Sequence, residues 1–141
     1  MKKILLFFAC ILLITGCESD GELTQEDIGT TPLSEASMLL YSGSFTPTSG
    51  IRVEGTAGIY QDGEEYRVAF DNFSVSSGPD LKVYLSKSNV PDDFINLGGL
   101  GSGEKQSYLI PVPVDFTEYN HVLIHCQQYN HLFAIAALQS N

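Results

Sequence analysis

Residues 51–70 read IRVEGTAGIYQDGEEYRVAF, and this stretch decides the fold class. Two segments rich in β-branched and aromatic residues flank an Asp-Gly pair, which is typical of a tight β-hairpin turn. We therefore predict antiparallel strands at 51–60 and 65–70, joined by the turn at 61–64.

The same composition continues on both sides of this hairpin. Further strand-like segments lie at 41–46, 80–86, 105–110, 121–126 and 132–138. No helical stripe of useful length accompanies them. Many short strands without helices bury their apolar faces by packing sheet on sheet. The sequence thus predicts an all-β fold, an antiparallel β-sandwich of about seven to nine short strands.

Two connections in this sandwich have their own signatures. Residues 87–104 are rich in glycine and proline with little periodicity, which predicts a long surface loop. The stretch DFTEYN at 115–120 is interpreted as one helical turn that leads into the last hairpin.

The N-terminal residues have the pattern of a bacterial lipoprotein signal. Two lysines precede an apolar run at 4–14, which is too short to cross a bilayer as a helix. The run ends in ITGC, which resembles the lipobox and implies cleavage before Cys17 and acylation of its sulfur, palmitate being a typical acyl group. We expect a signal peptide at 1–16; a plain secretory peptide with an incidental cysteine is the alternative.

The segment that follows the anchor is acidic. Residues 18–37 contain no basic residue and few large apolar ones, so they cannot bury enough surface to offset their ordering entropy. We therefore expect residues 17–40 to form a lipid-anchored tether and residues 41–141 to form the β domain. The apolar patch at 38–41 marks where the chain docks onto that domain.

The charge of the chain excludes one class of partner. Once residues 1–16 are removed, five basic residues remain against seventeen acidic ones. Such a chain repels phosphate backbones, so nucleic acid is not a partner. Membrane association then depends on the lipid at Cys17. Glu18 replaces the aspartate that retains enteric lipoproteins at the inner membrane, which favours a cell-envelope location at the outer membrane. Whether the chain faces the periplasm or the exterior stays open.

Near the C-terminus, HVLIHCQQYNH at 121–131 places three histidines around Cys126, the lone thiol left after Cys10 and Cys17 are accounted for. Alternation along a strand puts Val122, Ile124 and Cys126 on one face. His121, Leu123 and His125 then share the opposite face, and we expect both histidines to be partly exposed.

A four-residue loop at 127–130 sets His131 directly opposite Cys126 in the predicted hairpin. Phe133, Ile135 and Ala137 then join Val122 and Ile124 on the core face. A protonated imidazole beside the thiol favours the reactive thiolate, whereas apolar burial leaves the sulfur inert. Both readings of Cys126, a redox thiol tuned by His131 and a small core residue, stay open.

Other chemistry finds little support. Cys126 and His131 supply two metal ligands where three or four are needed, so no metal site is predicted. The absence of a Cys-x-x-Cys-His stretch excludes covalent c-type haem and leaves noncovalent haem ligation open. No motif of a classical enzyme is present. Asp80 ends the oxygen-rich stretch at 71–80, which we interpret as a turn rather than a calcium site.

Nearly all of the predicted domain resembles the DM-thirteen domain, an all-β extracellular module described as a predicted electron-transfer domain. The matching pieces are GSF at 43–45, VEGTAGIY at 53–60, FDNFSVSSGPDLKVYL at 70–85, QSYLIPVPVDFTEYNHVLIHC at 106–126 and LFAIAAL at 132–138. The resemblance implies a β-sandwich whose characteristic cysteine, aligned with Cys126, serves redox chemistry with a haem or a redox partner. That family often has an aromatic residue, commonly tryptophan, before the cysteine, whereas this chain has His125 there and no tryptophan.

The leading hypothesis is therefore a lipid-anchored envelope protein whose Cys126, tuned by His131, takes part in electron transfer with a partner protein. The alternative is a non-catalytic lipoprotein, structural or binding a glycan or protein through its loops, with a buried inert cysteine.

Overall fold

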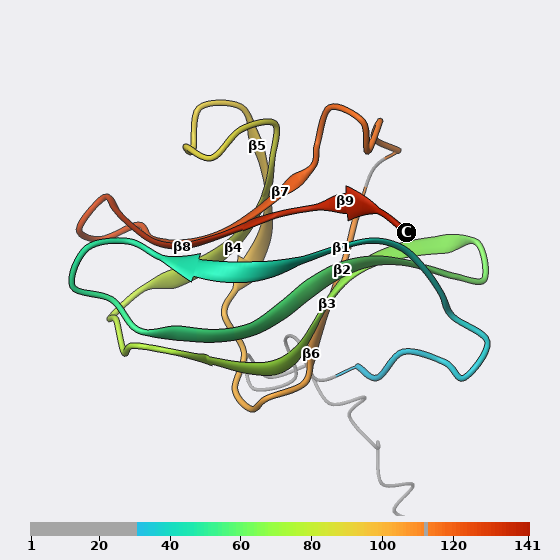
Figure 1. Cartoon of the computed structure of the whole chain (residues 1–141), viewed down its shortest axis with the longest axis horizontal. Helices are drawn as coiled ribbons and strands as arrows, with labels where there is room; N and C mark the ends of the chain where they lie inside the picture. Colours follow the sequence, from blue (N-terminus) through green and yellow to red (C-terminus); the bar gives the residue numbers. More distant parts are fainter. Residues whose placement is uncertain (1–30, 112) are drawn as a thin grey trace, which may run out of the picture.

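The computed structural model describes residues 31–111 and 113–141, and this part of the chain confirms the predicted all-β class (Figure 1). Its strands are β1 (Met38–Pro47), β2 (Val53–Asp62), β3 (Glu65–Val75), β4 (Leu81–Ser86), β5 (Phe94–Gly99), β6 (Gln106–Leu109), β7 (His121–Cys126), β8 (His131–Ala137) and β9 (Gln139–Ser140). Over these residues, no helix has the length and hydropathy that a membrane crossing needs.

The strands form one sheet that folds over on itself, and all of its pairs are antiparallel. The strand order is β5-β4-β7-β8-β1-β2-β3-β6, with β9 added beside β1. In Figure 1, β1 runs between β8 and β2, because its first part pairs with β2 and Phe45–Pro47 pair with β8. The two ends of the order, β5 and β6, also come close together. The sheet is therefore nearly closed, intermediate between a sandwich and a barrel.

The hairpin predicted around the Asp-Gly pair is confirmed. β2 and β3 pair from Val53 opposite Val75 to Asp62 opposite Glu65. Gly63 turns the chain with φ +66°, a left-handed conformation that costs glycine little. This hairpin is the longest paired unit of the sheet and supplies one wall of the core.

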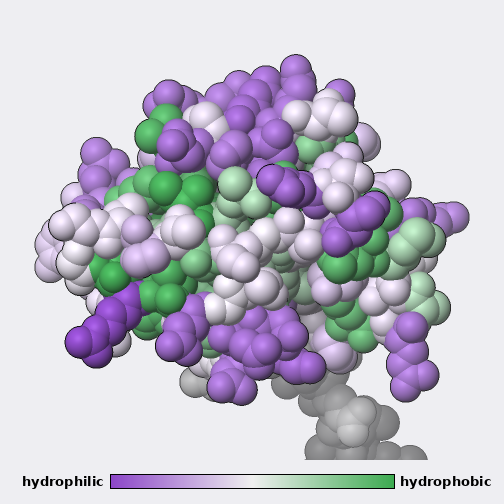
Figure 2. All heavy atoms as spheres, viewed as in Figure 1, coloured by the Kyte–Doolittle hydropathy of each residue, from purple (hydrophilic) through white to green (hydrophobic). Residues whose placement is uncertain are grey.

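The core lies between the two halves of the folded sheet. Its buried members come from both halves: Phe45, Ala57, Ile59, Val68, Phe70, Phe73, Val83, Leu85, Tyr108, Ile110, Val122, Ile124, Cys126, Phe133, Ala134, Ala136 and Leu138. Phe45, Phe70 and Phe73 contact one another, with ring centroids 4.7 to 5.1 Å apart. Burying such rings is the main favourable contribution to folding. Figure 2 shows polar side chains around the rim of one face, with apolar ones between them.

The chain that precedes β1 lies against the β2–β3 hairpin and β6. The backbone N–H and hydroxyl of Ser34 both donate to the Asp62 carboxylate, and the Ser107 hydroxyl donates to the Thr31 carbonyl. The Ser34 hydroxyl lowers the pKa of Asp62 by bonding to its ionised form. β1 begins at Met38, so residues 38–40 of the segment expected as tether are strand and residues 31–37 precede it as turn and irregular chain. The expected signal peptide at 1–16 and the rest of the tether, residues 17–30, lie outside the described residues.

The structure corrects the prediction of a long loop at 87–104. β5 lies within that stretch and pairs with β4 along its length. The sequence signal for this strand is the short apolar run Phe94-Ile95. The glycines at 98 and 99 have no side chains to continue the alternation, so the strand is hard to recognise. The interpretation of 115–120 as a single turn is confirmed, because the N–H of Tyr119 bonds to the Asp115 carbonyl at 2.9 Å.

Candidate functional site at the Cys126 end of the sheet

Cys126 ends β7 between two neighbouring strands. It lies opposite Leu81 of β4 on one side and opposite His131 of β8 on the other, so the predicted pairing with His131 is confirmed. Val122 and Ile124 share its inward face, also as predicted. The thiol is completely buried (0% exposed) within the core cluster. A partner molecule therefore does not reach the sulfur in this conformation.

A β-bulge changes the face pattern beyond this pair. Opposite β7, the register steps from Leu132, paired with His125, to Ala134, paired with Ile124, and leaves Phe133 as the extra residue. Phe133 is buried as predicted. The predicted core positions Ile135 and Ala137 are wrong: Ile135 is only half-buried and Ala137 is exposed.

Ala134 and Ala136 take those inward positions, opposite Ile124 and Val122. Because side chains alternate with a period of two, the extra residue reverses which residues of β8 point inward beyond Phe133.

His131 lies at the exposed start of β8. Its ring lies edge-on to Phe133, with centroids 5.3 Å apart and an interplanar angle of 74°. The imidazole is open to solvent directly across the ladder from Cys126, whereas the thiol is sealed in the core. The hairpin thus places a solvent-facing base opposite a sealed sulfur.

His125 is more buried than the sequence suggested. It is 5% exposed, which corrects the expectation of a partly exposed ring. Its Nε2 donates to Asn130 Oδ1 at 3.2 Å, and its Nδ1 is buried with no hydrogen-bond partner in the described part of the chain. Burial lowers the pKa of His125 and thereby favours the uncharged ring.

An aromatic stack covers His125 on the face opposite the core. Tyr84 is 2% exposed and lies 4.0 Å from Phe94, centroid to centroid, at an interplanar angle of 16°. Tyr84 also lies 5.5 Å from the His125 ring, centroid to centroid. Gln127 Nε2 donates to the Tyr84 hydroxyl at 2.9 Å. The stack therefore connects His125, which precedes Cys126 in the sequence, to Phe94 of the edge strand β5.

Sequence reasoning missed this stack. Phe94 fell in the stretch predicted as loop, so the partner of Tyr84 was not visible. The available signal was the alternation within DLKVYLS at 80–86, which puts Tyr84 on the face of Lys82 and away from Leu81, Val83 and Leu85.

His121 begins β7, at the opposite end of the strand from Cys126. It is half-buried, in agreement with the expected partial exposure, and burial lowers its pKa. It pairs with Ser86 on one side and Ala137 on the other. The structure therefore does not bring His121 to the Cys126 pair.

Asp80 lies just before β4 and forms an ion pair with Lys82, Oδ1 to Nζ, at 3.0 Å. Its carbonyl accepts a hydrogen bond from the Gln127 N–H, which ties the start of β4 to the loop after Cys126. Asp71, in the same oxygen-rich stretch, lies 3.8 Å from Lys105. Within residues 31–111 and 113–141, no three His, Cys, Asp or Glu side chains lie together in a way that would hold a metal ion.

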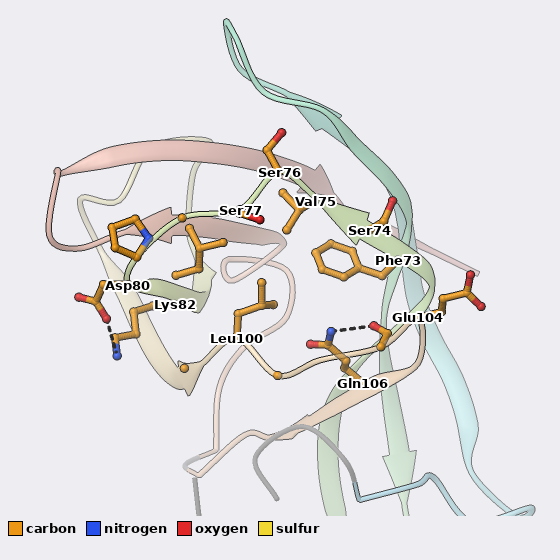
Figure 3. Close-up of a pocket in the computed structure, with 16 residues that line it drawn as sticks. Phe73, Ser74, Val75, Ser76, Ser77, Asp80, Lys82, Leu100, Glu104 and Gln106 are labelled. Atoms are coloured by element: carbon orange, nitrogen blue, oxygen red, sulfur yellow. Dashed lines mark hydrogen bonds and ion pairs between the residues drawn. The ribbon is translucent and has the colours of Figure 1, made fainter. Parts of the chain in front are cut away.

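A cavity of about 620 Å³ opens beside this end of the sheet (Figure 3). We name it the Leu100 cavity; it is lined by residues 73–82, 99–101, 103, 104 and 106. Leu81, the cross-strand neighbour of Cys126, forms part of its wall. The wall contains no histidine, cysteine, methionine or tyrosine, the usual axial ligands of haem iron, so these residues do not fit a haem.

Comparison with known proteins gives one match. A family model described as Electron transfer DM13 matches residues 45–138, from the middle of β1 to the residue before β9. No curated protein and no solved structure matches the chain. The matched range includes β7, Cys126 and both neighbouring strands, and it spans more than half of the sequence. The chain therefore belongs to the DM13 electron-transfer family.

Proposed function

We propose that this chain is a lipid-anchored protein of the cell envelope, at the outer membrane, whose DM13 domain transfers electrons through Cys126 and His131. The observation that supports electron transfer is the family match over residues 45–138. The pairing of His131 with Cys126 supports the choice of residues, because it places a proton acceptor opposite the thiol.

The anchor is proposed from the sequence. Two lysines, the apolar run at 4–14 and the ITGC ending occur in the order that lipoprotein signals require. Several acyl chains on Cys17 would hold the chain at the membrane, where a single chain binds only marginally. The acidic segment after Cys17 would then link the lipid to the domain.

Replacing Cys17 by serine tests the anchor. We expect the full chain, produced in a Gram-negative host, to sediment with membranes, whereas Cys17→Ser moves to the soluble fraction. The measurement is membrane fractionation, with metabolic labelling by a fatty-acid analogue. Cys10→Ser, in the apolar run, is the matched control and keeps both lipid and sedimentation. Equal labelling of Cys17→Ser and wild type would exclude Cys17 as the anchor.

The burial of Cys126 restricts how the thiol takes part. Thiol–disulfide exchange needs direct attack of sulfur on sulfur, which a completely buried side chain does not permit. Electron transfer through the surrounding side chains does not need such contact. In the proposed step the thiol gives one electron to an oxidised partner protein, a one-electron acceptor, and its proton to the imidazole of His131, which leaves a neutral thiyl radical.

Voltammetry of the full chain in detergent tests this step. We expect a one-electron wave in the wild type and none in Cys126→Ala, which keeps a small apolar group in the core. His131→Gln should retain the wave but lower its rate by roughly a hundredfold, since general-base transfer contributes about that factor. A wave that persists in Cys126→Ala would show that another group is oxidised.

A second candidate function is favoured by the complete burial of Cys126. In this alternative the thiol fills space in the core, and the chain is a structural or ligand-binding lipoprotein. It predicts no wave in wild type or in either variant. The same voltammetric series therefore separates the two functions.

A further inference from the structure

One side of the Leu100 cavity is apolar. Phe73, Val75, Leu81 and Leu100 belong to the core cluster or pack against it, and all four line the cavity. Figure 3 shows the Phe73 ring and the Leu100 side chain directed toward the open space between the end of β3 and the loop after β5. A volume of about 620 Å³ lies within the range of sites that bind small organic molecules.

The other side of the cavity carries the uncharged polar side chains of Ser74, Ser76, Ser77 and Gln106, two of which are already bonded. Gln106 Nε2 donates to the Gly103 carbonyl at 2.9 Å, and Ser76 Oγ accepts from the Arg52 N–H at 2.8 Å. The Ser77 hydroxyl lies on the cavity side in Figure 3, whereas the Ser76 hydroxyl points away from it. Ser77 thus offers a hydrogen bond to an otherwise apolar ligand.

The charges at the rim favour an uncharged ligand. Lys82 and Asp80 neutralise each other as an ion pair. Glu104, the remaining charged residue of the lining, points away from the cavity in Figure 3. A cation or an anion would lose its hydration on entry and find no unpaired opposite charge directed into the cavity.

A single residue, Leu81, separates the cavity from Cys126 across the β4–β7 ladder. Leu81 lines the cavity and is the direct cross-strand neighbour of Cys126 in the β4–β7 ladder. Residues paired in this way have Cβ atoms about 4.5 to 5.5 Å apart. Gly78, also in the lining, approaches the Phe133 ring, where an added Cβ would lie 3.0 Å from the nearest ring atom.

We propose that the Leu100 cavity binds an uncharged ring of the quinone class. Its apolar wall takes the ring, and Ser77 at the mouth bonds a ring carbonyl. The preference for an uncharged ligand with one apolar and one polar side follows from the cavity alone, while the choice of a redox-active ring rests on the proposed electron-transfer function.

The test blocks the cavity without disturbing the core. Ser77 makes no hydrogen bond within the described chain and is exposed, so Ser77→Phe places a ring into the mouth. Ser102 is exposed in the same loop region and is not part of the lining, which makes Ser102→Phe the matched control. The full chain in detergent is titrated with duroquinone, whose four methyl groups prevent addition of thiols, and binding is followed by the amide NMR shifts of Val75 and Gly101.

We expect saturable shifts at Val75 and Gly101 in the wild type and in Ser102→Phe. In Ser77→Phe the dissociation constant should rise at least about tenfold. Equal affinity in Ser77→Phe and Ser102→Phe would overturn the site. Durene, the same ring without carbonyls, should bind at least about tenfold more weakly; equal affinity would overturn the quinone assignment. Cys126→Ala should bind duroquinone as the wild type does, so the cavity is tested independently of the thiol.

Discussion

Gly43→Ala is expected to prevent the domain from folding. A Cβ at this position would overlap the carbonyl oxygen of Ala137 and lie 2.9 Å from its carbonyl carbon, and both are backbone atoms that do not move aside. Gly43 pairs with Ala57 of β2, and two residues later Phe45 pairs with β8. Displacing this part of β1 would disturb both halves of the sheet. We expect the free energy of unfolding to fall by about 4 kcal/mol or more.

Urea unfolding followed by circular dichroism tests this, because the variant should lack the cooperative transition that the wild type shows. Gly99→Ala is the matched control, because a Cβ there meets no atom within 4 Å. The control should change stability by less than about 1 kcal/mol. If the two variants unfold at the same urea concentration, the close approach of β1 to the end of β8 does not constrain the fold.

Tyr84→Ala should remove the largest contribution of the outer aromatic stack. The side chain is 2% exposed, lies on Phe94 at 4.0 Å and borders His125. Deleting a buried aromatic ring costs about 3 to 5 kcal/mol, because the transfer free energy is lost and a cavity is left. Thermal and urea unfolding of the variant would measure this loss.

Tyr84→Phe separates the ring from its hydroxyl. This variant keeps the stack and loses only the hydrogen bond from Gln127, which contributes about 1 kcal/mol. A loss in Tyr84→Phe as large as that in Tyr84→Ala would show that the hydroxyl, and not the stacked ring, stabilises this face. In either variant the core on the other side of β4 stays intact.

Much of the fold could be predicted because it follows from local pattern. Alternation and the Asp-Gly turn located the β2–β3 hairpin, and the four-residue loop fixed His131 opposite Cys126. These features depend only on neighbours in sequence. β5 was missed since it is an edge strand whose last residues are glycines without side chains to show alternation.

The candidate site was predicted less completely, for three physical reasons. The bulge at Phe133 inserts one residue into β8, and no residue type in LFAIAAL marks where alternation breaks. The burial of His125 depends on Tyr84 and Asn130, which tertiary structure and the hairpin loop bring to it. The Leu100 cavity is built from segments at 73–82 and 99–106, so its existence depends on the closure of the whole sheet.

The position of β1 between β2 and β8 also determines when the domain is completed. Its partners β8 and β9 are the last strands of the chain, so these pairings join residues that are distant in sequence. Until β8 and β9 are in place, one flank of β1 lacks its ladder partners, so the domain is complete only when strands distant in sequence have met.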